Sequence, residues 1–292
     1  MDTQPTDTQP TDTQPTDAQP TDAETVRAYY ASYGQREWQR LERAEGVVEW
    51  IVTTAILDAH LPATGHVLDL GGGPGRYSSW LLERGNDVTL ADLSPELLDI
   101  ARARPDRDRM AEITEADARD LSRWPDAAFD HVLALGPMYH LTDPVERAQA
   151  GAEMVRVLRP GGMIAIATMP WYGSLRRTLA LPDERRHFAD AQFVDDLKSH
   201  GIFHNDVPGR FNSGYGFRPA EIAPYFEELG LTTVTLVSTH GYASGMEETI
   251  VALRDEHPTA YEVAMRLLID TADDPSLFGL AGHLLYVGTK DM

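Results

Sequence analysis

The sequence predicts an α/β fold in which a doubly wound, Rossmann-like sheet of parallel strands carries helices on both faces. Beyond residue 63, short apolar runs alternate with helical patterns of about ten residues, as in right-handed βαβ units. Two helix starts, at 94–95 and 143–144, place an N-cap residue before a proline at the first helical position. A glycine-rich turn at 71–75 follows the first apolar run, at the sheet edge where open α/β folds bind ligands.

The N-terminal part divides into a repeat and a helical cap. Residues 2–21 repeat DTQPT, with one variant DAQPT, and hold almost no apolar side chain, so we expect residues 1–22 to be a disordered tail. Residues 23–62 are expected to form the cap. A short helix with three tyrosines is predicted over 23–34, and a second helix, with apolar residues spaced by three and four, ends before Pro62.

Residues 63–169 are expected to form the cofactor-binding α/β core, and its elements follow in order. Strands are predicted over 66–70, 87–92, 112–114, 129–135 and 163–168, and helices over 76–84, 95–103 and 144–158. An Arg-Pro-Gly-Gly turn at 159–162 is expected to end the last of these helices and lead into a strand.

The pattern changes after residue 169. Residues 170–217 hold helical fragments and a Gly/Asn-rich stretch, and we expect them to form a lid insertion over the carboxyl ends of the strands. Residues 218–292 are expected to return to the core. Their predicted elements are a helix over 219–229, strands over 231–239 and 283–289, and a helical insertion near 245–278.

Composition restricts the function classes. The 292 residues include 46 acidic and 25 basic side chains, a formal charge of −21, which argues against nucleic acid or an anionic membrane as a partner. Cysteine is absent, which excludes disulfides and thiolate chemistry, and the histidine spacing predicts no metal site. Neither a secretory leader nor a run of about 18 apolar residues is found, so a cytoplasmic protein is expected.

The glycine-rich turn, within VLDLGGGPGRYS (67–78), carries the ligand-binding signal. A Walker A loop requires a lysine after the glycines, and none follows. The dinucleotide pattern G-x-G-x-x-G also fails, because its third glycine position falls on Arg76 or Ser78. The pattern present is D-x-G-x-G-x-G.

This pattern resembles motif I of the class I S-adenosylmethionine-dependent methyltransferases, and the resemblance continues through VTLADLSPELLDIAR (88–102), ITEADARDL (113–121), FDHVLALGPMYHL (129–141) and LRPGG (158–162). It implies a seven-stranded sheet, S-adenosylmethionine as the cofactor and S-adenosylhomocysteine as the product. Asp92 would accept from the ribose hydroxyls, and Asp117 from the adenine amino group. The residues that the resemblance places at the cofactor are Asp69, Gly71, Gly72, Gly73, Gly75, Asp92, Leu93, Asp117, Ala118 and Leu135.

The acceptor is expected to be a small molecule, and a role in specialised metabolism is expected. LGGGPGRYS, LGPMYHL and the closing HLLYVG resemble a bacterial subgroup of small-molecule methyltransferases. The (D/N)-P-P-(Y/F) motif of enzymes that methylate amino groups of DNA bases is replaced by Leu-Gly-Pro-Met at 135–138, and cytosine C5 enzymes need a cysteine. The alternatives are a methyltransferase acting on protein or RNA, or a non-catalytic protein that binds S-adenosylmethionine. The sequence does not indicate the oligomeric state.

His140 and Tyr139 are the candidate catalytic residues, because they follow the fourth strand where the acceptor approaches in the family. The ordinary pKa of histidine suits a general base, although His140 could instead cap the next helix. Tyr29, Tyr30 and Tyr33 are candidates to cover the cofactor and acceptor, or else to pack in the core. Arginines within 173–218 would suit an anionic acceptor, unless they form solvent-exposed ion pairs.

Overall fold

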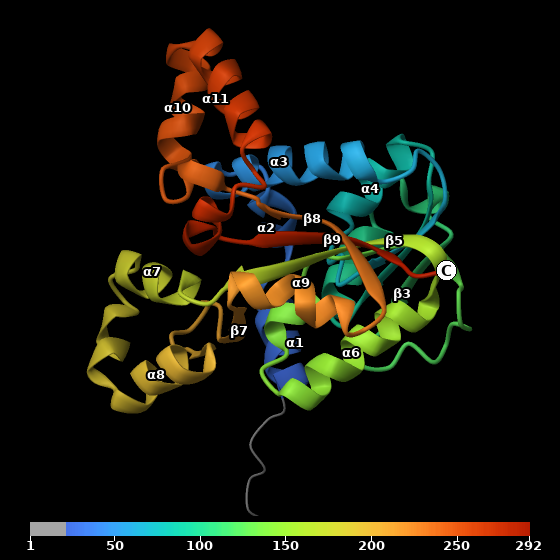
Figure 1. Ribbon diagram of the computed structural model, residues 1–292, viewed down its shortest axis with the longest axis horizontal. Coiled ribbons are helices and arrows are strands. Elements are labelled where there is room, and N and C mark those ends of the chain that lie inside the picture. Colours follow the sequence, from blue (N-terminus) through green and yellow to red (C-terminus); the bar gives the residue numbers. More distant parts are fainter. Residues whose placement is uncertain (1–21) are drawn as a thin grey trace, which may run out of the picture.

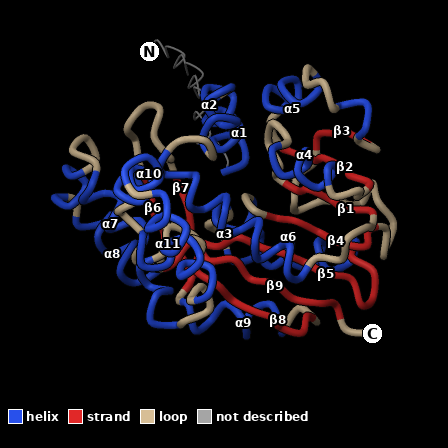
Figure 2. Tube along the Cα trace, turned by 90° about the horizontal axis from the view of Figure 1, so that it is seen from above, coloured by secondary structure: helices blue, strands red, loops and turns tan. Residues whose placement is uncertain are grey.

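The computed structural model describes residues 22–292, so the DTQPT repeat lies outside the described residues. A central sheet forms the body of the molecule. Five parallel strands are β1 (His66–Leu70), β2 (Asp87–Asp92), β3 (Glu112–Glu115), β4 (Phe129–Ala134) and β5 (Leu158–Pro170). β9 (Leu284–Lys290) pairs antiparallel with β5, and β8 (Leu231–Ser238) pairs antiparallel with β9. The order β3-β2-β1-β4-β5-β9-β8, visible in Figure 2, confirms the predicted seven-stranded sheet.

Helices cover both faces of the sheet (Figure 1). On one face, α3 (Ala44–His60), α4 (Arg76–Glu83) and α5 (Pro95–Arg102) contribute to one hydrophobic cluster. On the other face, α6 (Pro144–Val157) and α9 (Pro219–Glu227) contribute to a second. The strands between them are almost continuously buried, as expected for a parallel sheet covered on both sides.

Two predicted N-caps are confirmed. The Ser94 hydroxyl accepts from the Leu97 N–H at 3.4 Å and begins α5. The Asp143 carboxylate accepts from Val145 N–H at 2.7 Å and begins α6. Each cap satisfies backbone donors that the helix itself leaves unpaired. Because α5 follows β2 and α6 follows β4, both helices start at the carboxyl edge of the sheet, where the site lies.

The N-terminal cap contains three helices where the sequence predicted two. α1 (Asp22–Tyr33) ends at Gly34, whose φ of 55° only glycine adopts readily, and α2 (Gln35–Arg40) follows. The chain then turns, with Leu41 buried between α2 and α3. The apolar spacing through Leu41 was read as one continuous helix, and that interpretation was wrong because the chain breaks at 41–43.

The segment 170–217 contains a hairpin that the sequence did not predict. Its helical pieces are α7 (Gly173–Ala180), η3 (Arg185–Ala189), α8 (Ala191–Asp195) and η4 (Asp196–His200). β6 (Ile202–His204) and β7 (Ser213–Phe217) then pair antiparallel, and β7 adds in parallel to the end of β5. Gly216 permits this, because a Cβ there would lie 2.9 Å from the Trp171 Cα. Glycine lowers strand propensity, so the hairpin looked like a loop.

The remaining elements are short helices and one helical pair. They are η1 (Arg107–Arg109), η2 (Pro137–His140), η5 (Gly241–Ala243), η6 (Pro275–Leu280), α10 (Glu247–Glu256) and α11 (Pro258–Asp270). α10 and α11 project beyond the sheet in Figure 1, within the predicted helical insertion. The predicted turn at 159–162 is part of β5, with an irregular register beside β4. Across 22–292, every helix is too short or too polar to cross a membrane.

Candidate functional site

The glycine turn after β1 lies at the carboxyl edge of the sheet and packs closely against its neighbours. Gly71 and Gly73 have φ of 70° and 56°, and the Gly71 N–H donates to the Ala91 carbonyl at 2.7 Å. A Cβ on Gly72 would lie 2.5 Å from the Leu90 side chain, and one on Gly71 would lie 2.8 Å from Pro137. The turn is therefore packed between β2 and η2, and it leaves no room for side chains.

Asp69, near the end of β1, fixes the position of this turn through a contact with α4. Its carboxylate accepts from the Ser78 hydroxyl of α4 at 2.6 Å and is 1% exposed. Burial raises the pKa of Asp69 to about 6, although the Ser78 hydrogen bond opposes the shift. The contact ties the end of β1 to the first turn of α4 and fixes the path of the glycines.

Asp92, at the end of β2, presents a carboxylate to the same space. It accepts from the Gly73 N–H at 2.7 Å and from the Ser94 N–H at 2.8 Å. Burial raises the pKa of Asp92 to about 6, and the two backbone donors oppose that shift. A carboxylate has about four lone-pair positions, so Asp92 retains acceptor capacity for a ligand.

A cavity joins the glycine turn, the end of β2, η2 and the helices α1 and α2. The predicted site residues that line it are Tyr30, Asp69, Gly71, Gly72, Gly73, Asp92, Leu93, Asp117, Ala118, Leu135, Tyr139 and His140. Three others lie outside this lining. Gly75 begins α4 with a φ of 85°, while Tyr29 and Tyr33 stack on each other at 5.5 Å. Of the three tyrosines, Tyr30 is thus the one that faces the cavity.

Tyr30 and His140 meet inside this cavity. The Tyr30 hydroxyl lies 2.9 Å from the His140 Nε2. Burial, with a smaller effect of His283, lowers the pKa of His140 to about 3, while a backbone contact with Ser213 opposes the shift. Burial also raises the pKa of Tyr30 well above its usual range. Both groups are neutral near pH 7, and with the imidazole proton on Nδ1 the tyrosine donates to Nε2.

This pKa corrects the expectation for His140. A histidine with its ordinary pKa would change charge near working pH, but the buried imidazole stays neutral down to about pH 3. His140 is consequently a hydrogen-bond acceptor and a weak base. Its neighbour Tyr139 is also buried, with its hydroxyl donating to the Leu135 carbonyl at 3.2 Å. Burial raises the pKa of Tyr139, so it remains protonated as well.

Five rings form what we call the aromatic wall: Tyr29, Tyr30, Tyr139, His140 and Phe211. The His140 ring centroid lies 5.0 Å from that of Phe211 and 4.9 Å from that of Tyr139. Phe211 lies 6.3 Å from Tyr29. The wall combines α1, η2 and the turn between β6 and β7. Sequence reasoning missed Phe211 because it lies in a Gly/Asn-rich stretch without apolar periodicity.

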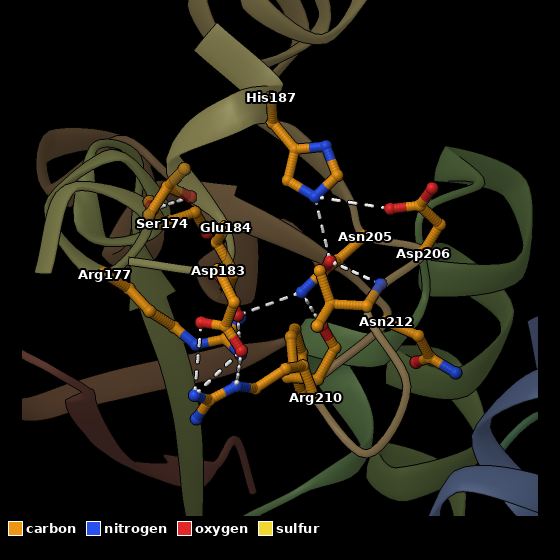
Figure 3. Close-up of polar contacts among 12 residues, drawn as sticks. Ser174, Arg177, Asp183, Glu184, His187, Asn205, Asp206, Arg210 and Asn212 are labelled. Atoms are coloured by element: carbon orange, nitrogen blue, oxygen red, sulfur yellow. Dashed lines mark hydrogen bonds and ion pairs between the residues drawn. The ribbon is translucent and has the colours of Figure 1, made fainter. Parts of the chain in front are cut away.

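A polar network within 170–217 connects Arg177, Glu184 and Asn205, which are labelled in Figure 3. The Glu184 side chain is fully buried and accepts from Arg177 at 2.7 Å and from the Asn205 Nδ2 at 3.0 Å. The same Asn205 amide nitrogen donates to the Phe211 carbonyl at 3.1 Å. Arg210 makes two further hydrogen bonds to Asp183. These arginines are engaged inside the insertion, which favours the ion-pair interpretation over an anion site.

Sequence reasoning also did not predict that charged residues of α2 belong to the site. Glu37 and Arg40 line the cavity, with the Arg40 Nε 2.9 Å from Glu37 and its terminal nitrogen 3.0 Å from Glu49 of α3. Burial alone would raise the pKa of Glu49, but Arg40 and His283 hold it well below its usual range. These contacts link α2 to α3 and, through Glu49, to His283 just before β9. In the sequence, the only signal for them was that α2 is polar.

With the geometry established, comparisons with known proteins identify the domain. A family model described as a methyltransferase domain matches residues 67–162, the stretch from β1 to the start of β5. Over this stretch the chain is therefore similar to methyltransferases, and the activity of the whole chain is proposed below.

Individual relatives agree. The methyltransferase GfsG of Streptomyces halstedii is 38% identical over 117 residues, which are 39% of this chain and 41% of that protein. Demethylmenaquinone methyltransferase of Clavibacter sepedonicus is 37% identical over 118 residues, 40% of this chain and 46% of that protein. The chain thus spans less than half the length of these relatives.

A solved structure matches over almost the whole chain. It is the Burkholderia thailandensis 1,6-didemethyltoxoflavin-N1-methyltransferase, with 1,6-didemethyltoxoflavin and S-adenosylhomocysteine bound. The TM-score is 0.55 at 20% identity, and the match covers 97% of this chain and 99% of that one. At this identity the likeness concerns the fold.

The cavity of the methyltransferase domain fits S-adenosylmethionine. The glycine turn lets the backbone approach a ligand closely, as the close neighbours of Gly72 require. Asp92 offers carboxylate lone pairs to hydroxyl donors, and Leu93 and Leu135 offer apolar surface. Rings of Tyr30 and Tyr139 line the space next to these groups, where their faces suit a sulfonium cation.

Asp117 fits its expected role less well than Asp92. Its carboxylate accepts three hydrogen bonds from the Arg119 guanidinium and one from the Arg119 backbone N–H. Arg119 in turn reaches Glu146 at 2.5 Å. These four contacts, made by three donor groups, occupy most of the acceptor positions that an adenine amino group would use. Contact between Asp117 and adenine stays a prediction.

Proposed function

We propose that the chain is an S-adenosylmethionine-dependent methyltransferase acting on a small molecule. One observation carries the proposal: a single cavity holds both the glycine turn with Asp92 and the Tyr30–His140 pair. The first part offers a cofactor site, and the second offers a hydrogen-bonding partner for an acceptor. α1 lines this space with Val26 and Tyr30, which suits an enclosed metabolite better than a protein surface or RNA.

Some of these residues bind the cofactor or the acceptor, and others keep water away from the reacting atoms. S-adenosylmethionine supplies an electrophilic methyl group on a positively charged sulfur. Asp92 accepts hydrogen bonds from the bound ribose, and the turn of Gly71 to Gly73 allows close backbone approach. Tyr139 helps to exclude water, and the neutral His140 Nε2 accepts a hydrogen bond from an acceptor. Rate enhancement then comes mainly from orientation of two bound partners in a dry site.

Labelled-methyl transfer tests this function. The full chain is incubated with methyl-labelled S-adenosylmethionine and, separately, with small-molecule, protein and RNA fractions of a bacterial extract. We expect label in the small-molecule fraction and at least a tenfold lower yield with Asp92→Asn. Label confined to protein or RNA would contradict the choice of acceptor. Tight S-adenosylhomocysteine binding without transfer to any fraction would indicate a non-catalytic binding protein.

A further inference from the structure

We propose that the methyl acceptor is a neutral planar ring carrying a hydroxyl group, and that this hydroxyl binds at the His140 Nε2 in the place now held by the Tyr30 hydroxyl. The proposal rests on the function proposed above and names its substrate class. In the closed structure, Tyr30 is a phenol of the protein's own chain that occupies the acceptor position.

The first argument is the geometry of the Tyr30–His140 pair. The phenol oxygen is 2.9 Å from Nε2, and the two rings meet edge to face at 5.4 Å and 81°. Both residues line the cavity that contains the glycine turn and Asp92. A site that accommodates one phenol next to a neutral imidazole has the shape and the hydrogen-bond acceptor that another aryl hydroxyl needs.

The surrounding rings give the second argument. Phe211 and Tyr139 lie 5.0 and 4.9 Å from the His140 ring, within the range at which aromatic rings attract one another. If Tyr30 withdraws, these two rings, 6.3 Å from each other, remain as flat apolar surfaces next to the histidine. Flat apolar walls favour a planar ring over a flexible aliphatic acceptor.

Charge supplies the third argument. The Arg40 guanidinium lies between Glu37 and Glu49, and Arg177 is paired with the fully buried Glu184. His140 is neutral. A carboxylate or phosphate group on the acceptor would therefore find both guanidinium groups already paired, and it would also lose its own hydration. An uncharged ring with one polar hydrogen fits the wall better than an amino acid or a phosphate ester.

Two polar contacts that join α1 to other elements involve exposed or uncharged groups, so breaking them costs little. Arg27 pairs with Glu115 at 3.0 Å, but both side chains are more than two-fifths exposed, so the pair stabilises little. The Asn212 amide donates to the Thr25 carbonyl at 3.1 Å. By contrast, Phe211 is held through Asn205 and Glu184, and His140 follows β4 directly. The acceptor hydroxyl thus replaces the Tyr30 hydroxyl, while His140 and Phe211 stay in place.

The chemical step balances with the groups named. The hydroxyl oxygen of the ring attacks the methyl carbon, an O–C bond forms, and the S–C bond breaks with its electron pair going to sulfur. The His140 Nε2 accepts a hydrogen bond from the hydroxyl and orients it, and the proton leaves to solvent water once the O–C bond has formed. A neutral thioether, a methyl ether and a hydrated proton result, and His140 stays neutral.

Binding measurements with two matched probes test the proposal without turnover. 2-Naphthol and its methyl ether, 2-methoxynaphthalene, are titrated by calorimetry into the full chain saturated with S-adenosylhomocysteine. We expect the wild type to bind 2-naphthol at least threefold more tightly than the ether. In Tyr30→Phe the His140 acceptor is free, so that preference should rise a further three- to tenfold, the usual value of one net hydrogen bond.

Two variants separate the explanations. Tyr33→Phe removes a hydroxyl from the same helix at a residue outside the cavity lining, and the preference should match that of the wild type. His140→Phe keeps a ring but removes Nε2, so the preference should fall to about one. Equal binding of the two probes to the wild type, no binding of either, or no increase in Tyr30→Phe would overturn the proposal. In each case intact S-adenosylhomocysteine binding leaves the proposed function standing, whereas its loss in the wild type contradicts that function.

Discussion

Asp92→Asn, measured across pH, tests whether this carboxylate holds the cofactor. In the free protein burial raises the pKa of Asp92 from its ordinary value of 3.8 to about 6. Hydroxyl donors of a bound ribose favour the charged carboxylate, so binding must lower this pKa and release a proton below about pH 6. With a free pKa of 6, roughly one carboxyl in eleven is ionised at pH 5, so affinity should be about tenfold weaker there than at pH 7.

The assay is calorimetric titration of S-adenosylhomocysteine at pH 5, 6 and 7, in two buffers with different ionisation enthalpies. The wild type should release nearly one proton at pH 5 and almost none at pH 7. Asp92→Asn keeps the side-chain shape but loses the charge-assisted hydrogen bonds, each worth about 1.5–3 kcal/mol. Its affinity should fall at least tenfold at pH 7 and no longer change with pH. A wild-type affinity that is flat between pH 5 and 7 would refute the reasoning. A slope that persists in the variant would instead belong to Asp69, whose pKa is also about 6.

Other variants test the supports of the site. Asn205→Ala removes hydrogen bonds to Glu184 and to the Phe211 carbonyl. Urea denaturation should show a loss of about 1–3 kcal/mol, with S-adenosylhomocysteine affinity unchanged by calorimetry. Burial lowers the pKa of His140 from its ordinary value of 6.5 to about 3 in the folded protein, so the unfolded state binds more protons below pH 6.5. The contribution of His140 to stability is therefore lost as pH falls from about 6.5 toward 3, by roughly 1.4 kcal/mol per pH unit. His140→Phe should reduce the loss of stability measured in urea between pH 6.5 and 4.5, and an unchanged loss would contradict the assigned pKa. Gly72→Ala should abolish cofactor binding and destabilise by about 1–3 kcal/mol, since its Cβ would lie 2.5 Å from a Leu90 methyl group, and normal calorimetric binding would contradict the packing described.

The core of the fold could be predicted because its signals are local. Buried parallel strands appear as short apolar runs, and the caps at Ser94 and Asp143 mark helix starts by their own chemistry. The hairpin of β6 and β7 could not be predicted in the same way. Its glycines lower strand propensity, and the reason for Gly216 is Trp171, which is distant in the sequence. α2 was likewise hidden, because helical spacing continued across a break in the chain.

The site was predictable where one residue's role follows from its place at a strand end. Asp92 and the glycine turn lie at the carboxyl edge of the sheet, so their proximity follows from topology. Glu37 and Arg40 reach the cavity from α2, and Phe211 contacts the His140 ring from the turn between β6 and β7. The docking of both elements depends on tertiary contacts. The pKa of His140 was also out of reach, since it depends on burial under α1 and Phe211 rather than on residue type.

The pairing of β7 with β5 determines which segment near the aromatic wall exchanges its backbone amide hydrogens slowly. The Trp171 N–H donates to the Phe217 carbonyl at 2.7 Å, and the Gly216 N–H donates to the Gly201 carbonyl at 2.8 Å. Amides in this ladder open only when the sheet edge itself unravels, so deuterium should replace their hydrogens almost as slowly as those of the central strands. α1 has no such ladder, and its amides should exchange on a much faster timescale. Residence times of bound ligands would then follow the opening rate of residues 22–33, while the insertion behaves as an immobile wall.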